Sequence, residues 1–223
     1  MADIILIQPL TGTWDEMSIR LPESLLAVAS VPVAKGYSVR IIDQRTSKNF
    51  ISEIDSSIEK HTGIIGITAI TGEQIRHALY VTRLVKARHP NVPVCWGGVH
   101  ATLLPEQTIA HHLIDFVVVG DGENTFCALF ERLRDGISLD GLHGLLYKNE
   151  GRIFSNAGRL EVKQSLSEGR YSVKRIDGQV DLIREMDCLP PLPYHLLNME
   201  DYAVFDADNG SRSATLNTSR GCP

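Results

Sequence analysis

The end of the chain carries its clearest chemical signal, a cysteine on a loop that follows a strand-like run. Residues 213–218 lead directly into Ser219-Arg220-Gly221-Cys222-Pro223. A strand that delivers such a loop is typical of the opening of a domain whose chemistry uses the thiol, and an ordinary thiol is the alternative interpretation of Cys222. We therefore expect the front part of a larger enzyme, in which a complete module is followed by the start of a second domain.

Glycines and hydroxyl side chains follow two of the apolar runs in the first half of the chain. Thr68 and Thr71 flank the start of a helix, where Thr71 is either its N-cap or a ligand contact. Gly97 and Gly98 end the next run, and such a pair permits positive φ or the close approach of a flat ligand. A plain tight turn explains the two glycines as well.

The loops after two other runs narrow the class of ligand. Gln8 and Pro9 open a loop that lacks the Gly-x-Gly-x-x-Gly fingerprint of dinucleotide binding and the acidic cluster of a phosphoacceptor domain. Further along, the segment 120–123 reads Gly-Asp-Gly-Glu, a turn that feeds a helix with acids in its first turn, for which capping is the alternative. Because open parallel sheets bind ligands at the carboxyl ends of their strands, we expect these loops to share one rim.

The elements that must position these loops are short strands alternating with helices. Runs rich in isoleucine and valine lie at 4–7, 38–42, 63–68, 92–96 and 116–119. Their nearly continuous hydrophobicity is typical of parallel strands covered on both faces. Apolar residues repeat at helical spacing within 51–58, 75–82 and 126–133, and a further helix, kinked by Pro32, is expected at about 23–35. The alternation predicts an α/β fold, a doubly wound five-stranded parallel sheet of the flavodoxin-like type.

Composition excludes several classes of protein. The chain has 223 residues, 43% of them hydrophobic, and a formal net charge of −5 with scattered basic residues, so we expect no nucleic-acid partner. No apolar stretch approaches the roughly 20 residues of a membrane-spanning helix, and the start has no basic signal-peptide region, so we expect a cytoplasmic protein. The four cysteines are too widely spaced for a disulfide framework, and we expect Cys95, Cys127 and Cys188 to be buried or half-buried thiols.

In their order and spacing, these loops resemble the cobalamin-binding domain of cobalamin-dependent radical S-adenosylmethionine enzymes. The resemblance rests on Gln8-Pro9, the Gly36-Tyr37 turn before Asp43, Gly66-Ile67-Thr68, the segment 97–102 and the segment 119–123. It continues through residues 186–193 and 198–202 to 218–223, which is similar to the approach to the family's Cys-x-x-x-Cys-x-x-Cys motif. Asp121 is a departure, since the family more often has glutamate there.

The resemblance implies a corrinoid on the carboxyl rim of the sheet, with its nucleotide tail inserted into the domain. The cofactor-binding residues that it implies are Gln8, Pro9, Thr68, Thr71, Gly97, Gly98, Val99, His100, Gly120, Gly122 and Glu123. Classical modules supply an axial histidine from Asp-x-His-x-x-Gly, which is absent here, so we expect base-off cobalamin without a protein histidine on cobalt. His100, the only histidine on the predicted rim, either reaches the corrin amides or is a polar loop residue. We also expect Gly98→Leu to block the ligand and leave the fold intact.

For the full-length protein the resemblance implies a 4Fe–4S cluster with S-adenosylmethionine. Cys222 would be its first ligand, and two further cysteines are expected four and seven positions beyond it. Because such a cluster needs three thiolates, the 223-residue chain alone is expected to be inactive. The implied parent reaction is methyl transfer or a related radical rearrangement on a small-molecule substrate.

The chain is expected to have three regions. They are a cobalamin-binding α/β domain at 1–140, a hairpin and Pro-rich linker at 141–212, and the start of a truncated barrel domain at 213–223. The hairpin is expected at 145–154 about an Asn-Glu-Gly turn, and the linker is stiffened by its prolines. Two other functions remain open, a stand-alone corrinoid carrier and a nucleotide- or flavin-binding module of the same fold.

Overall fold

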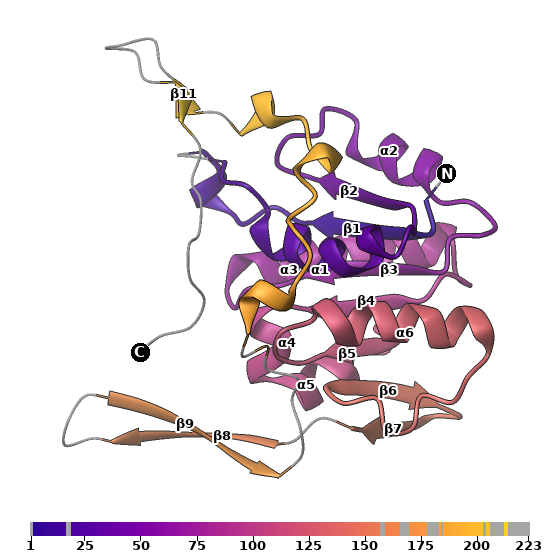
Figure 1. Cartoon of the computed structure of the whole chain (residues 1–223), viewed down its shortest axis with the longest axis vertical. Helices are drawn as coiled ribbons and strands as arrows, with labels where there is room; N and C mark the ends of the chain where they lie inside the picture. The colour runs from indigo at the N-terminus through magenta and orange to yellow at the C-terminus, as the bar shows by residue number, and fades with distance from the viewer. Residues whose placement is uncertain are drawn as a thin grey trace.

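A computed structural model describes most of the chain. The described residues are 2–16, 19–156, 159–165, 170–177, 183, 185–202, 204–205 and 212–213. The strand and cysteine loop that we expect beyond Ser213, including Cys222, lie outside these residues. The described part is an α/β fold built on a mostly parallel sheet (Figure 1).

The main sheet has seven strands in the order β2-β1-β3-β4-β5-β6-β7. The neighbouring strands β2, β1, β3, β4 and β5 run parallel to one another. β6 is antiparallel to β5, and β7 is antiparallel to β6. The strands are β1 (Ile4–Gln8), β2 (Val39–Asp43), β3 (Ile64–Thr68), β4 (Val94–Gly97), β5 (Phe116–Val118), β6 (Leu145–Asn149) and β7 (Arg152–Ser155). The five parallel strands are confirmed. The predicted total of five is wrong, because the hairpin of β6 and β7 joins the sheet beside β5.

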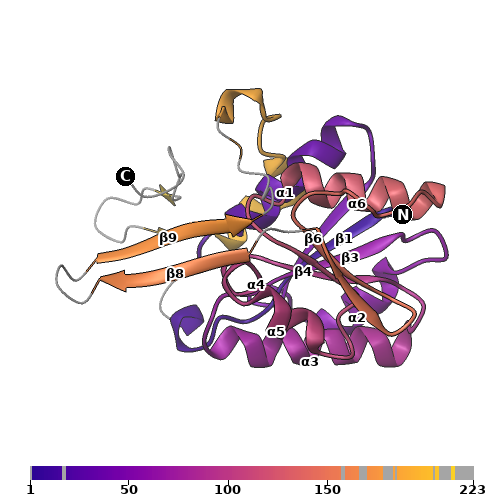
Figure 2. The same ribbon diagram turned by 90° about the horizontal axis from the view of Figure 1, so that it is seen from below.

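Helices cover both faces of the sheet, which confirms the doubly wound arrangement (Figure 2). One face carries α1 (Glu23–Ala34) and α6 (Glu123–Asp135), and the other carries α2 (Phe50–Ser57), α3 (Glu73–Arg88), α4 (Val99–Leu103) and α5 (Pro105–Ala110). Strand residues alternate between the two faces, so Leu6 packs toward α1 while Ile5 and Ile7 pack toward α2 and α3. The sequence patterns do not predict α4, α5 or the 3₁₀ turn η1 (Thr13–Glu16), since each is too short to show an apolar stripe.

The predicted hairpin is confirmed, and a second hairpin follows it. Glu150 and Gly151 join β6 to β7 with φ of 48° and 74°, and positive φ at both central residues is what a two-residue type I′ turn requires. The strands β8 (Arg159–Ser165) and β9 (Arg170–Asp177) form a separate antiparallel pair that projects from the body (Figure 2). The polar sequence of this pair gives no clear periodicity, so it is not predicted.

Residues 185–202, here called the connector, return across the α1 side of the molecule (Figure 1). They contain the 3₁₀ turns η2 (Met186–Cys188), η3 (Tyr194–Leu196) and η4 (Met199–Asp201). Four apolar side chains of the connector pack against the core on this face: Leu192, Tyr194, Leu196 and Leu197. Beyond it, β10 (Val204–Phe205) pairs with β11 (Arg212–Ser213). In the described ranges, no helix combines the length and apolar character needed to cross a membrane.

Candidate functional site: a cavity at the carboxyl rim

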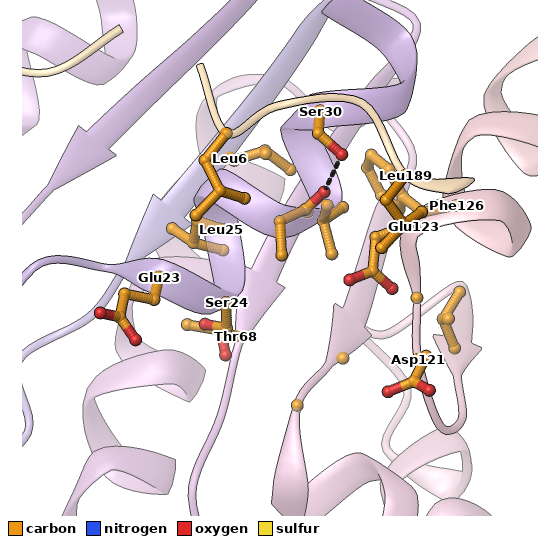
Figure 3. A pocket seen from close by; sticks show the side chains of 18 of the residues that line it. Leu6, Glu23, Ser24, Leu25, Ser30, Thr68, Asp121, Glu123, Phe126 and Leu189 are labelled. Carbon is orange, nitrogen blue, oxygen red and sulfur yellow. Dashed lines mark hydrogen bonds between the residues drawn. The ribbon is translucent and has the colours of Figure 1, made fainter. Parts of the chain in front are cut away.

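A cavity of about 550 Å³ lies at the carboxyl ends of β3, β4 and β5, on the face that α1 and α6 cover. We call it the rim cavity. Its walls come from the sheet, from the N-terminal turns of α1 and α6, and from the connector (Figure 3). This is the place at which open parallel sheets bind ligands, because strand ends and helix N-termini converge there.

The rim cavity exists because small residues occupy the strand positions that face it. Gly66 and Thr68 alternate toward this face along β3, and Cys95 and Gly97 do so along β4. A Cβ at Gly66 would approach the Phe126 ring to 3.0 Å, so a larger residue does not fit there. Burial raises the pKa of the Cys95 thiol well above its usual range, so Cys95 contributes a neutral, apolar surface.

Gly97 and Gly98 have different structural roles at the end of β4. Gly98 has φ 88° and ψ −171°, a backbone region that is almost restricted to glycine. A Cβ on Gly98 would lie 2.7 Å from Thr68 Oγ1 and 2.9 Å from the Ala69 carbonyl oxygen. The expectation that Gly98→Leu leaves the fold intact is therefore wrong. A Cβ on Gly97 would meet only the Val118 carbonyl oxygen, at 4.0 Å, so Gly97 is the glycine that leaves free space in the cavity.

The charged residues of the cavity wall are acidic. Glu23 lies in the first turn of α1 and Glu123 in the first turn of α6, where the helix N-terminus stabilises negative charge. Asp121 lies on the loop between β5 and α6 (Figure 3), and Glu123 is 1% exposed. No lysine, arginine or histidine is found among the described residues that line the cavity. The cavity is thus suited to an apolar group with hydrogen-bond donors, and unsuited to a terminal phosphate.

His100 lies inside the protein instead of facing the rim. It is 7% exposed, and its Nδ1 lies 3.2 Å from Thr71 Oγ1. Burial lowers the pKa of this imidazole, which favours the neutral form. The N-cap of α3 is Gly72, without a side-chain cap bond, so the interpretation of Thr71 as the N-cap is wrong. Thr71 instead fixes the ring of His100.

Gln8 and Pro9 organise the loops beside the cavity. The Gln8 side-chain amide donates to the Pro9 carbonyl oxygen at 3.0 Å, and Gln74 Nε2 donates to the same oxygen at 3.3 Å. Gln74 Oε1 also accepts a hydrogen bond from the Ile70 N–H at 2.7 Å. These bonds join the loops after β1 and β3. Above them on the rim, Val99 is 53% exposed at the start of α4.

The structure brings together about half of the predicted site residues in one cavity. Those that line it are Thr68, Gly97, Gly98, Gly120, Gly122 and Glu123. Four others lie around it on the same rim, namely Gln8, Pro9, Thr71 and Val99, whereas His100 is buried below the rim. In the described ranges, no three histidine, cysteine or carboxylate side chains converge as a metal site. Cys222, the predicted cluster ligand, lies outside those ranges.

Sequence reasoning missed two groups of cavity residues. One comprises small residues inside the elements, namely Ser24, Ala27, Gly66 and Cys95. Their signal is a small residue at alternate strand positions or on one face of a helix, among neighbours that are bulky. The other comprises Met186 and Leu189–Leu192 of the connector, and no local pattern indicates where such a segment packs. Cys188, expected to be buried or half-buried, is exposed on the connector, whereas Cys95 and Cys127 are buried.

Comparison with known families identifies the class of domain. The family model described as B12 binding domain matches residues 22–130, which include α1 and most of the rim loops. Over these residues the chain is similar to B12-binding domains.

Similar proteins place this domain in a narrower context. An uncharacterized methyltransferase of Pyrococcus horikoshii is 33% identical over 204 residues, which are 91% of this chain and 39% of that protein. Among solved structures, the apo form of the cobalamin-dependent S-adenosylmethionine radical enzyme OxsB is similar over 99% of this chain and 27% of its own, with a TM-score of 0.64 and 20% identity. The radical S-adenosylmethionine methyltransferase TsrM from Kitasatospora setae, solved with cobalamin and a 4Fe–4S cluster, is similar over 77% of this chain and 31% of its own, with a TM-score of 0.58 and 16% identity.

The chain therefore resembles the cobalamin domains of radical S-adenosylmethionine methyltransferases. At 16% and 20% identity the structural likenesses establish the fold. The chain spans 39% of the length of the Pyrococcus relative.

Proposed function

We propose that this chain binds cobalamin in the base-off state, with the nucleotide tail in the rim cavity and the corrin ring over the carboxyl rim. The observation that carries the proposal is the match between cavity and tail. A cavity of about 550 Å³ accepts a benzimidazole ring with its ribose, and its walls are apolar apart from the three acids and a few hydroxyls. Glu23, Asp121 and Glu123 would accept hydrogen bonds from ribose hydroxyls.

The corrin ring would lie where apolar side chains reach solvent at the rim. Ile70 is 51% exposed and Val99 is 53% exposed, on the loops that follow β3 and β4. His100 is buried and its ring contacts Thr71, so its imidazole would not be available as a cobalt ligand. Bound cobalamin would supply a cobalt centre that carries a methyl group. The residues of this chain would hold the corrinoid, orient it and keep water from the tail.

The acidic wall favours cobalamin over the nucleotide- or flavin-binding alternative. Free nucleotides and flavin mononucleotide end in a phosphate, which needs cations or a series of backbone N–H donors. Three acids and no basic residue among the described cavity lining would repel such a group. The phosphodiester of cobalamin is internal to the tail, so it can stay at the cavity mouth while the base enters.

The activity that we propose for the whole protein is methyl transfer by a radical S-adenosylmethionine mechanism. Its support is the likeness to proteins named as methyltransferases and the cysteine at the end of this chain. In this proposal the three regions 1–140, 141–212 and 213–223 are a cobalamin domain, a linker and the start of a catalytic domain. A stand-alone corrinoid carrier is the second candidate, and the residues encoded beyond Pro223 distinguish the two.

The visible spectrum of the bound cofactor tests the cobalamin proposal. Titration of the protein with methylcobalamin is expected to convert the base-on spectrum to the base-off spectrum at one equivalent, because the tail leaves the cobalt for the rim cavity. His100→Ala is expected to keep the base-off spectrum. A histidine-ligated spectrum that is lost in His100→Ala would contradict the base-off assignment, and the absence of any corrinoid binding would contradict the proposal as a whole.

A further inference from the structure

The connector supplies part of the wall of the rim cavity. Met186, Leu189, Pro190, Pro191 and Leu192 all line the cavity. Leu189 lines the same cavity as Glu123 and Phe126 of α6 (Figure 3). A ligand in the cavity would therefore contact this segment as well as the sheet and the helices.

The two ends of the connector are held very differently. Just before it, the Ile183 N–H donates to Asp121 Oδ2 at 3.0 Å, and residues 185–188 that follow are exposed. At the far end, Tyr202 is 5% exposed and its hydroxyl donates to Asp43 Oδ2 at 3.0 Å. Leu196 and Leu197 add apolar packing near that end. The segment over the cavity thus lies between a weakly held end and a firmly held end.

We infer that residues 186–192 act as a closing strap on the rim cavity, which lifts for the nucleotide tail to enter and then packs against it. This inference rests on the proposed cobalamin function. Pro190 and Pro191 fix their own φ, so the strap moves as a stiff unit relative to the rest of the connector, which packs against the core from Tyr194 onward. Packing of Leu189 on the tail would slow its release. The strap would therefore affect ligands that have a nucleotide tail and leave tail-less corrinoids unaffected.

A pair of corrinoids separates the strap from the rest of the site. Cobalamin carries the nucleotide tail and cobinamide lacks it. In the 223-residue chain, Leu189→Ala is expected to speed the dissociation of cobalamin about tenfold, the effect of losing the apolar contact of a half-buried leucine. The dissociation of cobinamide is expected to stay unchanged. Leu197→Ala is the matched control, because Leu197 is also a half-buried connector leucine but lines a second cavity beside β2.

A spin label on the strap gives a second readout that does not depend on a variant of the wall. Cys188 is exposed on the strap, whereas Cys95 and Cys127 are buried, and burial raises the pKa of the Cys127 thiol to about 11. In a Cys222→Ser background a nitroxide reagent would therefore label Cys188. Cobalamin is expected to reduce the mobility of the label, and cobinamide is expected to leave it unchanged.

The outcomes distinguish the strap from the cobalamin proposal. The strap alone would be overturned by the following combination of results. The wild-type protein binds both corrinoids, Leu189→Ala and Leu197→Ala change the dissociation rate of cobalamin equally, and the mobility of the label does not change when cobalamin binds. Failure of the wild-type protein to bind either corrinoid would overturn the proposed function on which the strap rests.

Discussion

Single residues decide how much space the rim cavity has. Gly97 and Gly98 are adjacent in the sequence, yet the second is required by its backbone conformation and the first by the cavity. At Gly98 a side chain would enter the backbone of the loop after β3, whereas at Gly97 it would point into free space. Substitutions at Gly98 should therefore affect stability, whereas substitutions at Gly97 should affect ligand binding.

Gly97→Leu is expected to weaken cobalamin binding by about a hundredfold or more, which corresponds to roughly 2.7 kcal/mol, because the side chain would fill the position of the tail. Its free energy of unfolding should stay within about 1 kcal/mol of the wild-type value. Binding is measured by spectroscopic titration and stability by denaturant unfolding. Gly97→Ala is the graded control, and Gly98→Ala should instead lower stability by about 1–3 kcal/mol. An unchanged affinity in Gly97→Leu would remove the cavity from the binding site.

At the scale of elements, the sequence predicts those helices and strands whose apolar residues form a local pattern. The strands β1 to β5 are predictable because they are short runs of mostly apolar, buried residues, and α2, α3 and α6 because apolar residues repeat along them at helical spacing. The rim loops follow from the strand ends. The small helices α4 and α5, the polar pair β8–β9 and the placement of the connector are set by tertiary packing, which leaves no period in the sequence. For the same reason the sequence predicts the rim loops of the site but not the connector residues that also line the cavity.

The far end of the connector depends on a buried polar cluster at the end of β2. Asp43 accepts hydrogen bonds from Arg45 Nη2 at 2.6 Å and from the Tyr202 hydroxyl at 3.0 Å. Burial and the nearby Asp43 carboxylate raise the pKa of Tyr202, so its hydroxyl remains a donor at neutral pH. A hydrogen bond to an ionised carboxylate is stronger than one between two neutral groups.

Tyr202→Phe is expected to lower the free energy of unfolding by about 1.5–3 kcal/mol, the range for a hydrogen bond to a charged group. Denaturant unfolding monitored by circular dichroism measures the change. Tyr80→Phe on α3 is the control, because the Tyr80 side chain is 45% exposed and its loss of a hydroxyl should have little effect. Equal stabilities of the two variants would show that this cluster does not hold the connector.

At the scale of the whole molecule, the cysteines limit what this chain does alone. A 4Fe–4S cluster open to S-adenosylmethionine needs three thiolates on one loop. Of the four cysteines, Cys95 and Cys127 are buried in the α/β core and Cys188 is on the connector. These three cysteines lie on separate elements, and the nearest of them in sequence is 34 residues from Cys222 (222 − 188), so they do not match the spacing of the expected cluster motif.

Anaerobic reconstitution of the 223-residue chain with iron and sulfide is expected to give no stoichiometric cluster absorbance and no reductive cleavage of S-adenosylmethionine. A longer form that continues past Pro223 with cysteines four and seven positions beyond Cys222 should gain both. Iron content and product analysis by chromatography provide the measurements. Cleavage by the short chain would contradict the proposed division into domains, and a continuation without those cysteines would favour the carrier.

The connector also has a consequence for self-association. β2 is an edge strand with three buried aliphatic residues, and an uncovered edge of that kind can pair with a strand of another molecule. The turn η3 packs beside β2. The connector, which lines the rim cavity, therefore also lies next to this edge strand. A protein shortened before residue 194 would expose this edge, and its tendency to aggregate would rise even with every strand of the main sheet intact.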